Sequence, residues 1–141
     1  MPNSQAICTS FKQELLTGTH ALAADTIKAA LYLATATVNG STTAYSATGE
    51  ATGAGYTAGG IVVTTANAPS SSGTTAFWTP SASAVFTTIT IAATDCVLFY
   101  NSSKANRAIS AHTFSSQTVT AGTLTLTMPV NNATTGLLRI A

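Results

Sequence analysis

Apolar and polar residues alternate with a period of two through much of the chain, which is the pattern of half-buried β-strands. The alternation is clearest over residues 85–91. Residues 96–100 are nearly all apolar and predict a strand buried on both faces. A polar turn at 101–107 separates this segment from another strand pattern at 108–114. We therefore expect the two segments to form a β-hairpin.

The remaining strand patterns follow at intervals of about ten residues, separated by turn signals such as the Pro80-Ser81 step and Pro129. A bend is expected at 92–95 and a turn at 67–73. The further predicted strands are 26–34, 61–66, 74–79, 123–128 and 137–140. About eight strands with this spacing predict an all-β fold, an antiparallel β-sandwich or jelly-roll-like domain, with a small barrel as the other closed form.

The N-terminal region has a different pattern. We expect a mobile arm over residues 1–9 and a short helix over 10–18, because Ser10 can cap the helix, Gln13 follows three residues later and Gly18 can close the C-terminus. So short a helix needs support, either from the sheet of the same subunit or from a neighbouring one. Residues 1–141 are predicted to form one domain, with the strands in 26–141.

Glycine is concentrated at 49–60, which holds five of the ten glycines. We interpret the segment as a long connection that ends in a tight turn into the next strand, since glycine adopts positive φ readily. A phosphate-binding loop is the alternative, but the lysine of that motif is absent and no helix pattern follows.

The charge content is unusually low. Only 6% of residues are charged and the net charge is +1, against roughly 25% charged residues in ordinary globular proteins. These values give no basis for binding nucleic acid or a membrane surface electrostatically. No apolar run approaches the roughly 18 residues that span a bilayer, and the N-terminus has no secretory pattern. Such a surface is easily desolvated, which favours packing against other chains.

Candidate chemistry is sparse, and we predict no catalytic, cofactor-binding or metal-binding residue, so the chain is not expected to be an enzyme. His20 and His112 lie outside any metal or catalytic motif and are interpreted as structural. The four acids are scattered, so nothing marks a glycosidase pair. Cys8 and Cys96 are too few for a disulfide framework and are expected to be buried thiols, with a single bridge between them as the alternative.

Residues on the predicted helix, in the glycine-rich loop or the connection before it, and in the polar turn are the candidates for contact with other proteins. A core role is the alternative for the apolar members, and a solvated turn is the alternative for the charged ones. The candidates are Phe11, Leu15, Tyr45, Tyr56, Gly59, Gly60, Lys104 and Arg107.

Several segments resemble small structural proteins encoded by tailed bacteriophages. The likeness runs in the same order through 10–20, 27–32, 49–50 with 55–60, and 98–104. Members of that family often have an Ala-Arg-Gly step before the apolar strand, where this chain has Ala93-Thr94-Asp95, so no role of that arginine is carried over. The resemblance implies a virion component, assembled in the bacterial cytoplasm, of the kind that decorates or cements a capsid.

Three functional hypotheses follow. In the first, the chain is a capsid cement protein that binds the major capsid protein and copies of itself, as a dimer or trimer. In the second, it is a tail or fibre component that binds host glycan through Tyr45, Tyr56 and Trp78. A cell-wall hydrolase is a third possibility, and it would require two nearby acids, one of them shielded from water.

Overall fold

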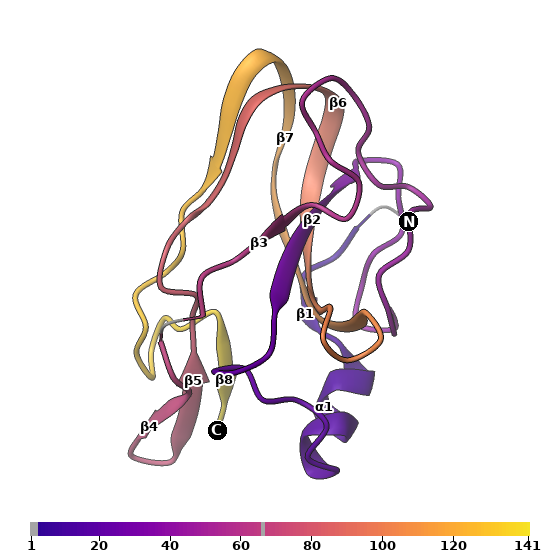
Figure 1. Ribbon diagram of the computed structural model, residues 1–141. Coiled ribbons are helices and arrows are strands. Elements are labelled where there is room, and N and C mark those ends of the chain that lie inside the picture. The colour runs from indigo at the N-terminus through magenta and orange to yellow at the C-terminus, as the bar shows by residue number, and fades with distance from the viewer. Residues whose placement is uncertain (1–2, 66) are drawn as a thin grey trace.

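The computed structural model describes residues 3–65 and 67–141, and it confirms the predicted all-β fold with one short helix. Two antiparallel sheets form the domain, with strand orders β1-β7-β6-β2-β3 and β4-β5-β8. In Figure 1 the smaller sheet lies at the lower left, and α1 lies at the lower right. The strands of the large sheet are β1 (Ala6–Ile7), β2 (Ile27–Leu33), β3 (Ile61–Val62), β6 (Ala84–Asn101) and β7 (Arg107–Leu126). The small sheet contains β4 (Ser70–Ser72), β5 (Thr75–Trp78) and β8 (Leu138–Ile140).

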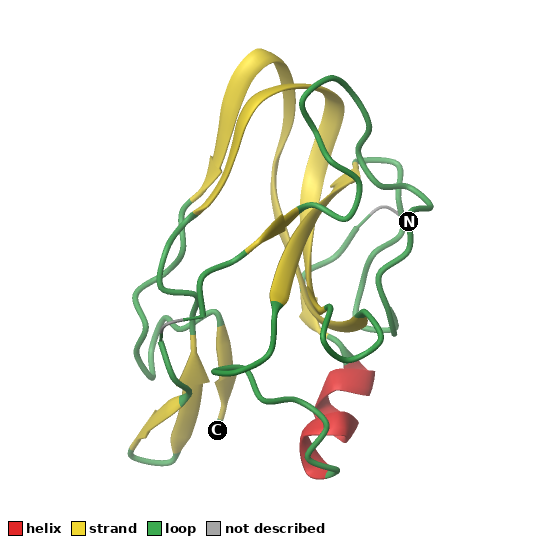
Figure 2. Cartoon of the chain, viewed as in Figure 1, coloured by secondary structure: helices red, strands yellow, loops and turns green. Residues whose placement is uncertain are grey.

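The centre of the fold is the β6–β7 hairpin, whose strands arch together over the top of the molecule (Figure 2). It contains the hairpin predicted from residues 96–100 and 108–114, with Val97 opposite His112 and Leu98 opposite Ala111. The turn between the strands is short, since β6 ends at Asn101 and β7 begins at Arg107. Residues 97–100 are at most 3% exposed, which agrees with the expected burial on both faces.

The predicted division of these strands is wrong. Residues 85–91 and 96–100 belong to the single strand β6, and 108–114 and 123–128 largely to the single strand β7. The expected bend at 92–95 is a series of register shifts within the paired strands, between Ile91 and Cys96. β-bulges bend a strand without ending its pairing. Residues 92–95 therefore curve one continuous strand, where we expected them to separate two strands.

The N-terminal arm is built into the domain over its described part. Asn3 donates from Nδ2 to Leu33 O at 3.0 Å and to Asp95 Oδ1 at 2.6 Å, and Ser4 N–H donates to Val38 O at 2.9 Å. Ala6 and Ile7 then form β1 at the edge of β7. This arrangement replaces the mobile arm expected at 1–9, of which residues 1–2 lie outside the described residues.

The helix α1 spans Thr9–Leu16, and its N-cap differs from the prediction. The N-cap residue is Cys8, which makes no side-chain capping hydrogen bond. Ser10, the expected cap, lies inside the first turn, and its buried hydroxyl has no hydrogen-bond partner in the described structure. The C-terminal end is as expected, because Gly18 has φ of 71° and donates to Leu15 O at 3.2 Å. Phe11, 1% exposed, attaches the helix to the core.

Two smaller predictions also change. The expected strand at 61–66 pairs only at Ile61–Val62 (β3), and Ala66 lies outside the described residues. The turn expected at 67–73 contains a strand, since Ser70–Ser72 pairs with Thr75–Trp78 and the reversal comes at Gly73, with φ of 57°. Three consecutive serines carry no apolar alternation, so β4 had no pattern signal.

Both cysteines are buried free thiols, as predicted. Burial raises the pKa of Cys8 to about 11 and that of Cys96 to about 12. No helix in the described part of the chain is long and apolar enough to cross a membrane.

Candidate functional site

The glycine-rich segment 49–60 packs on the strands β6 and β2 along its length. Ala54 O accepts a hydrogen bond from Thr90 N–H at 2.8 Å. A Cβ on Gly53 would lie 1.8 Å from Thr90 O, and one on Gly55 would lie 2.0 Å from Thr88 O. Side chains at these positions would prevent this close approach. The glycines therefore serve as close-contact points between a loop and a strand.

Glu50 is the centre of a buried hydrogen-bond network within this segment. Glu50 is only 4% exposed, and its carboxylate accepts three hydrogen bonds. Tyr45 Oη donates to Oε2 at 2.7 Å, while Tyr56 Oη and Gly59 N–H donate to Oε1 at 2.9 and 2.7 Å. A carboxylate taken out of water needs such donors. Glu50 thus holds together three parts of the long connection.

The hydroxyls of Tyr56 and Tyr100 link the same network to the sheet. Tyr56 Oη accepts from Leu31 N–H at 2.9 Å, and Tyr100 Oη donates to Gly59 O at 2.7 Å. Burial, together with the nearby Glu50 charge, raises the pKa of Tyr45 and Tyr56 above the usual range of a phenol, and it raises that of Tyr100 to about 12. These phenols are neutral donors at physiological pH and not acid–base groups.

A second polar cluster joins α1 to the turn between β6 and β7. Glu14 accepts from His20 Nε2 at 2.6 Å and pairs with Arg107 Nη1 at 2.5 Å. Asn101 Nδ2 lies 3.0 Å from His20 Nδ1 and donates to Asp25 Oδ2 at 2.7 Å. When His20 is neutral, its ring proton lies on Nε2, because the Asn101 amide then donates to Nδ1.

The cluster continues to the surface through Asp25. Burial opposes ionisation of this carboxyl, but hydrogen bonds from Ala21 N–H and Asn101 and the Lys104 and His20 charges together lower its pKa below the ordinary value. Lys104 Nζ lies 3.8 Å from Asp25 Oδ1. The arrangement fastens the helix and the following loop to the hairpin turn.

The candidate contact residues fall into these two networks. Tyr45, Tyr56 and Gly59 surround Glu50, and Gly60 is buried beside β2. The rest lie around α1, with Phe11 buried, Leu15 partly buried, and Lys104 and Arg107 in ion pairs. All eight thus have internal contacts, and their contact with another protein stays a prediction.

The aromatic residues of the glycan hypothesis do not gather into one patch. Trp78 is 2% exposed, and its Nε1 donates to Asn67 O at 2.9 Å. Tyr45 stacks on Tyr100 with ring centroids 4.8 Å apart, and its hydroxyl is bound to Glu50. Tyr56 stacks on Phe86. In this structure the three rings face other parts of the chain.

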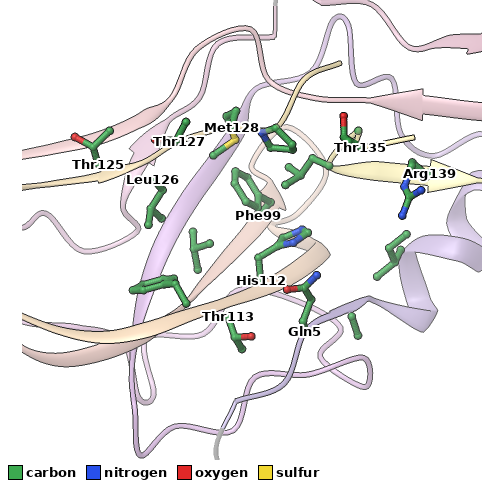
Figure 3. A pocket seen from close by; sticks show the side chains of 17 residues that line it. Gln5, Phe99, His112, Thr113, Thr125, Leu126, Thr127, Met128, Thr135 and Arg139 are labelled. Carbon is green, nitrogen blue, oxygen red and sulfur yellow. The ribbon is translucent and has the colours of Figure 1, made fainter. Parts of the chain in front are cut away.

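A groove of about 760 Å³ opens between the large sheet and the C-terminal segment. Figure 3 shows His112 and Phe99 on one side of it, Met128 and Thr135 on the other, and Arg139 near its end. Its volume lies in the range of roughly 300–1,000 Å³ typical of ligand sites. Sequence patterns did not indicate this groove. The one available signal was a charged residue, Arg139, within the otherwise apolar strand 137–140.

His112 is the only histidine in the groove lining. Its Nε2 lies 3.0 Å from Ser110 Oγ, and its ring packs edge-on against Phe99 at 5.7 Å. Burial lowers the pKa of His112 to about 4. In the described structure neither ring nitrogen of His112 is hydrogen-bonded to a carboxylate, so Ser110 and His112 do not form a catalytic triad. No cluster of three or more metal-ligating side chains occurs among residues 3–65 and 67–141.

The lowered pKa of His112 predicts an acid-dependent loss of stability. The unfolded chain takes up this proton near pH 6.5, whereas the folded chain takes it up only near pH 4. Between these values the unfolded state binds more protons, so the free energy of unfolding should fall with decreasing pH by up to about 1.4 kcal/mol per pH unit. Urea denaturation from pH 7 to 4 measures the slope.

The matched control is His112→Gln, which cannot titrate. It should show a shallower dependence between pH 6.5 and 4, and both proteins should lose stability below this window as carboxylates such as Asp25 become protonated. Equal slopes for the two proteins above pH 4 would contradict the assignment.

Comparisons with known proteins identify no family for this chain. No family model matches it, no curated protein matches it, and no solved structure matches it.

Proposed function

We propose that the chain is a bacteriophage virion structural protein that binds the outer face of the capsid and stabilises neighbouring capsomers. One observation carries the proposal: all four carboxylate side chains are bound within the fold. Glu14 and Asp25 hold the helix and hairpin turn, Glu50 holds the glycine-rich loop, and Asp95 accepts from Asn3. The exterior therefore has almost no free negative charge.

The consequence is a surface that can be covered at low cost. Removing a charge from water is expensive unless the charge finds a partner, whereas hydroxyl and methyl groups lose much less on burial. The curved β6–β7 ribbon is an example of such a hydroxyl- and methyl-rich surface. Its exposed residues include Thr87, Thr90, Thr120 and Thr123. A protein that docks in many copies on a repeating lattice benefits from such a surface.

The resemblance to small phage virion proteins supports the same function, and the proposed partners are the major capsid protein and copies of this chain, as a dimer or trimer. The proposal assigns no catalytic residue. It locates the protein in the virion, after assembly in the bacterial cytoplasm. Binding only to the assembled shell would stabilise that shell by mass action.

Quantitative mass spectrometry of purified virions tests the proposal. A decoration protein should be present in a number of copies comparable with that of the major capsid protein or a simple fraction of it. A tail or fibre component would be present in far fewer copies, and that result, or absence from the particle, would overturn the capsid proposal.

A further inference from the structure

Arg139, like Lys12 and Lys28, has no ion pair in the described part of the chain. Of the five Lys and Arg residues, Lys104 and Arg107 pair with Asp25 and Glu14. Arg139 is exposed on the edge strand β8, and it is the only Lys or Arg side chain that lines the 760 Å³ groove. His112, the other basic group there, is neutral at pH 7 because burial lowers its pKa. The groove therefore offers one unneutralised positive charge.

The body of the groove is apolar and aromatic. Phe99 and Val97 line its floor from β6 and are 0% and 3% exposed. Phe114 and Met128 add partly buried surface from β7 and the segment after it. Hydroxyl groups of threonines complete the lining (Figure 3). An occupant would thus bury apolar side chains and present a carboxylate to Arg139, which binds carboxylates through a planar, bidentate contact.

The groove also adjoins an unpaired strand edge. β1 pairs with β7 only at Ala111 and Ser110, and then Ser4 turns away to bond with Val38. From His112 onward, β7 is paired with β6 on one side and with no other strand of the described structure. His112 and Thr113, the first residues of this free edge, line the groove together with Gln5. An extended peptide could pair with this free edge of β7, in line with β1, by β-augmentation.

A second copy of this chain has no unbound acidic side chain to offer the groove. The four acidic side chains of this chain are Glu14, Asp25, Glu50 and Asp95, and each is already bound in its own subunit. A second copy could offer one of them only by breaking these internal contacts. The unpaired Arg139 and the internally bound acids together favour a partner that supplies its own acidic residue.

We propose that the groove between β7 and β8 binds an extended, acidic segment of another protein, with its apolar side chains on Phe114 and Met128 and its carboxylate on Arg139. Under the proposed function, on which the source of the segment rests, this protein is the major capsid protein. The groove would then be the point at which the decoration protein holds the shell.

The first arm of the test uses defined probes and needs no shell. Ten-residue Thr/Val peptides carrying one Asp, and matched peptides with Asn or Lys instead, are titrated into the ¹⁵N-labelled protein. We expect the Asp peptides to shift the amide signals of Thr113, Met128 and Arg139 and to bind about tenfold more tightly than the Asn peptides. Arg139→Glu should abolish this preference and favour the Lys peptides. Failure of every peptide to shift the groove signals, or an unchanged preference in Arg139→Glu, would overturn the proposal.

The second arm uses purified shells that lack this protein. Arg139→Glu and Thr113→Trp, which places a bulky ring at the groove, should each bind shells at least tenfold more weakly than the wild type. Lys12→Glu and Thr118→Trp are matched controls at exposed positions outside the groove lining, and they should bind as the wild type does. Circular dichroism confirms folding of all four variants.

The two arms separate this proposal from the proposed function. Shell binding that is unaffected by both groove variants would overturn the groove proposal and leave the capsid function standing. Peptide binding that depends on Arg139, without binding to shells, would support the groove as an acidic-segment site and overturn the capsid as its source.

Discussion

Replacing Gly60 with alanine should remove most of the stability of the domain. Gly60 has φ of 71°, and a Cβ at this position would lie 1.8 Å from Ala29 O and 2.6 Å from Ala29 C on β2. Both atoms belong to the backbone of a buried central strand, so the clash cannot be relieved by rotating a side chain. We expect a loss of about 4 kcal/mol or more in the free energy of unfolding, because exceptional values arise from such backbone conflicts. Urea denaturation measures it.

Gly73→Ala is the matched control. Gly73 also has positive φ, at 57°, but no atom lies within 4 Å of the position its Cβ would occupy. An alanine at position 73 would be strained only by its left-handed backbone conformation, which costs roughly 1–2 kcal/mol. Similar losses for the two variants would show that the close approach of the loop to β2 is not what requires glycine at position 60.

Replacing Glu50 with alanine should cost several kcal/mol, because each buried donor left without an acceptor costs about 1–3 kcal/mol. Three donors lose their acceptor at once: the hydroxyls of Tyr45 and Tyr56 and the amide of Gly59. The loss should be accompanied by easier ionisation of the tyrosines, since the Glu50 charge contributes to their raised pKa values. Chemical denaturation and a spectrophotometric titration of the phenols measure the two effects.

Asp95→Asn provides the comparison for Glu50. Asp95 is only partly buried, and its one side-chain hydrogen bond among the described residues is with Asn3. Removing its charge should change stability by about 1 kcal/mol or less, as for most exposed polar contacts. An equal loss in the two variants would mean that the Glu50 network does not hold the glycine-rich connection in place.

The alternation of side chains was sufficient to predict the fold class and the central hairpin. The apolar run at 96–100 and the alternation at 85–91 reflect burial on one or both faces of a sheet, which is a local property of the sequence. The continuity of β6, in contrast, does not follow from any local pattern in the sequence. Residues 92–95 are compatible with a loop, and they remain in a strand only because β7 pairs with them through successive register shifts.

The interior networks could not have been located from the sequence for a similar reason. Glu50 is bonded to Tyr45 and Tyr56 nearby in the chain, but its burial depends on the packing of the loop against β2 and β6. Asp25 and Asn101 lie 76 residues apart and meet through the hairpin turn. Ser10 had the sequence features of a helix cap, yet the chain enters α1 directly from β1 and places the cap position at Cys8.

The groove depends on the placement of elements that no pattern relates. Arg139 on the last strand, Gln5 before the first and His112 near the start of β7 line one cavity because the small sheet folds back beside the large one. Its unpaired charge became visible only once the partners of the other ionisable groups were known.

The most direct test of the account is an electron cryomicroscopy image of phage particles lacking this protein, recorded before and after the purified chain is added back. We expect added density at regular positions on the outside of the capsid. Density confined to the tail, or particles unchanged by the addition of folded protein, would contradict it.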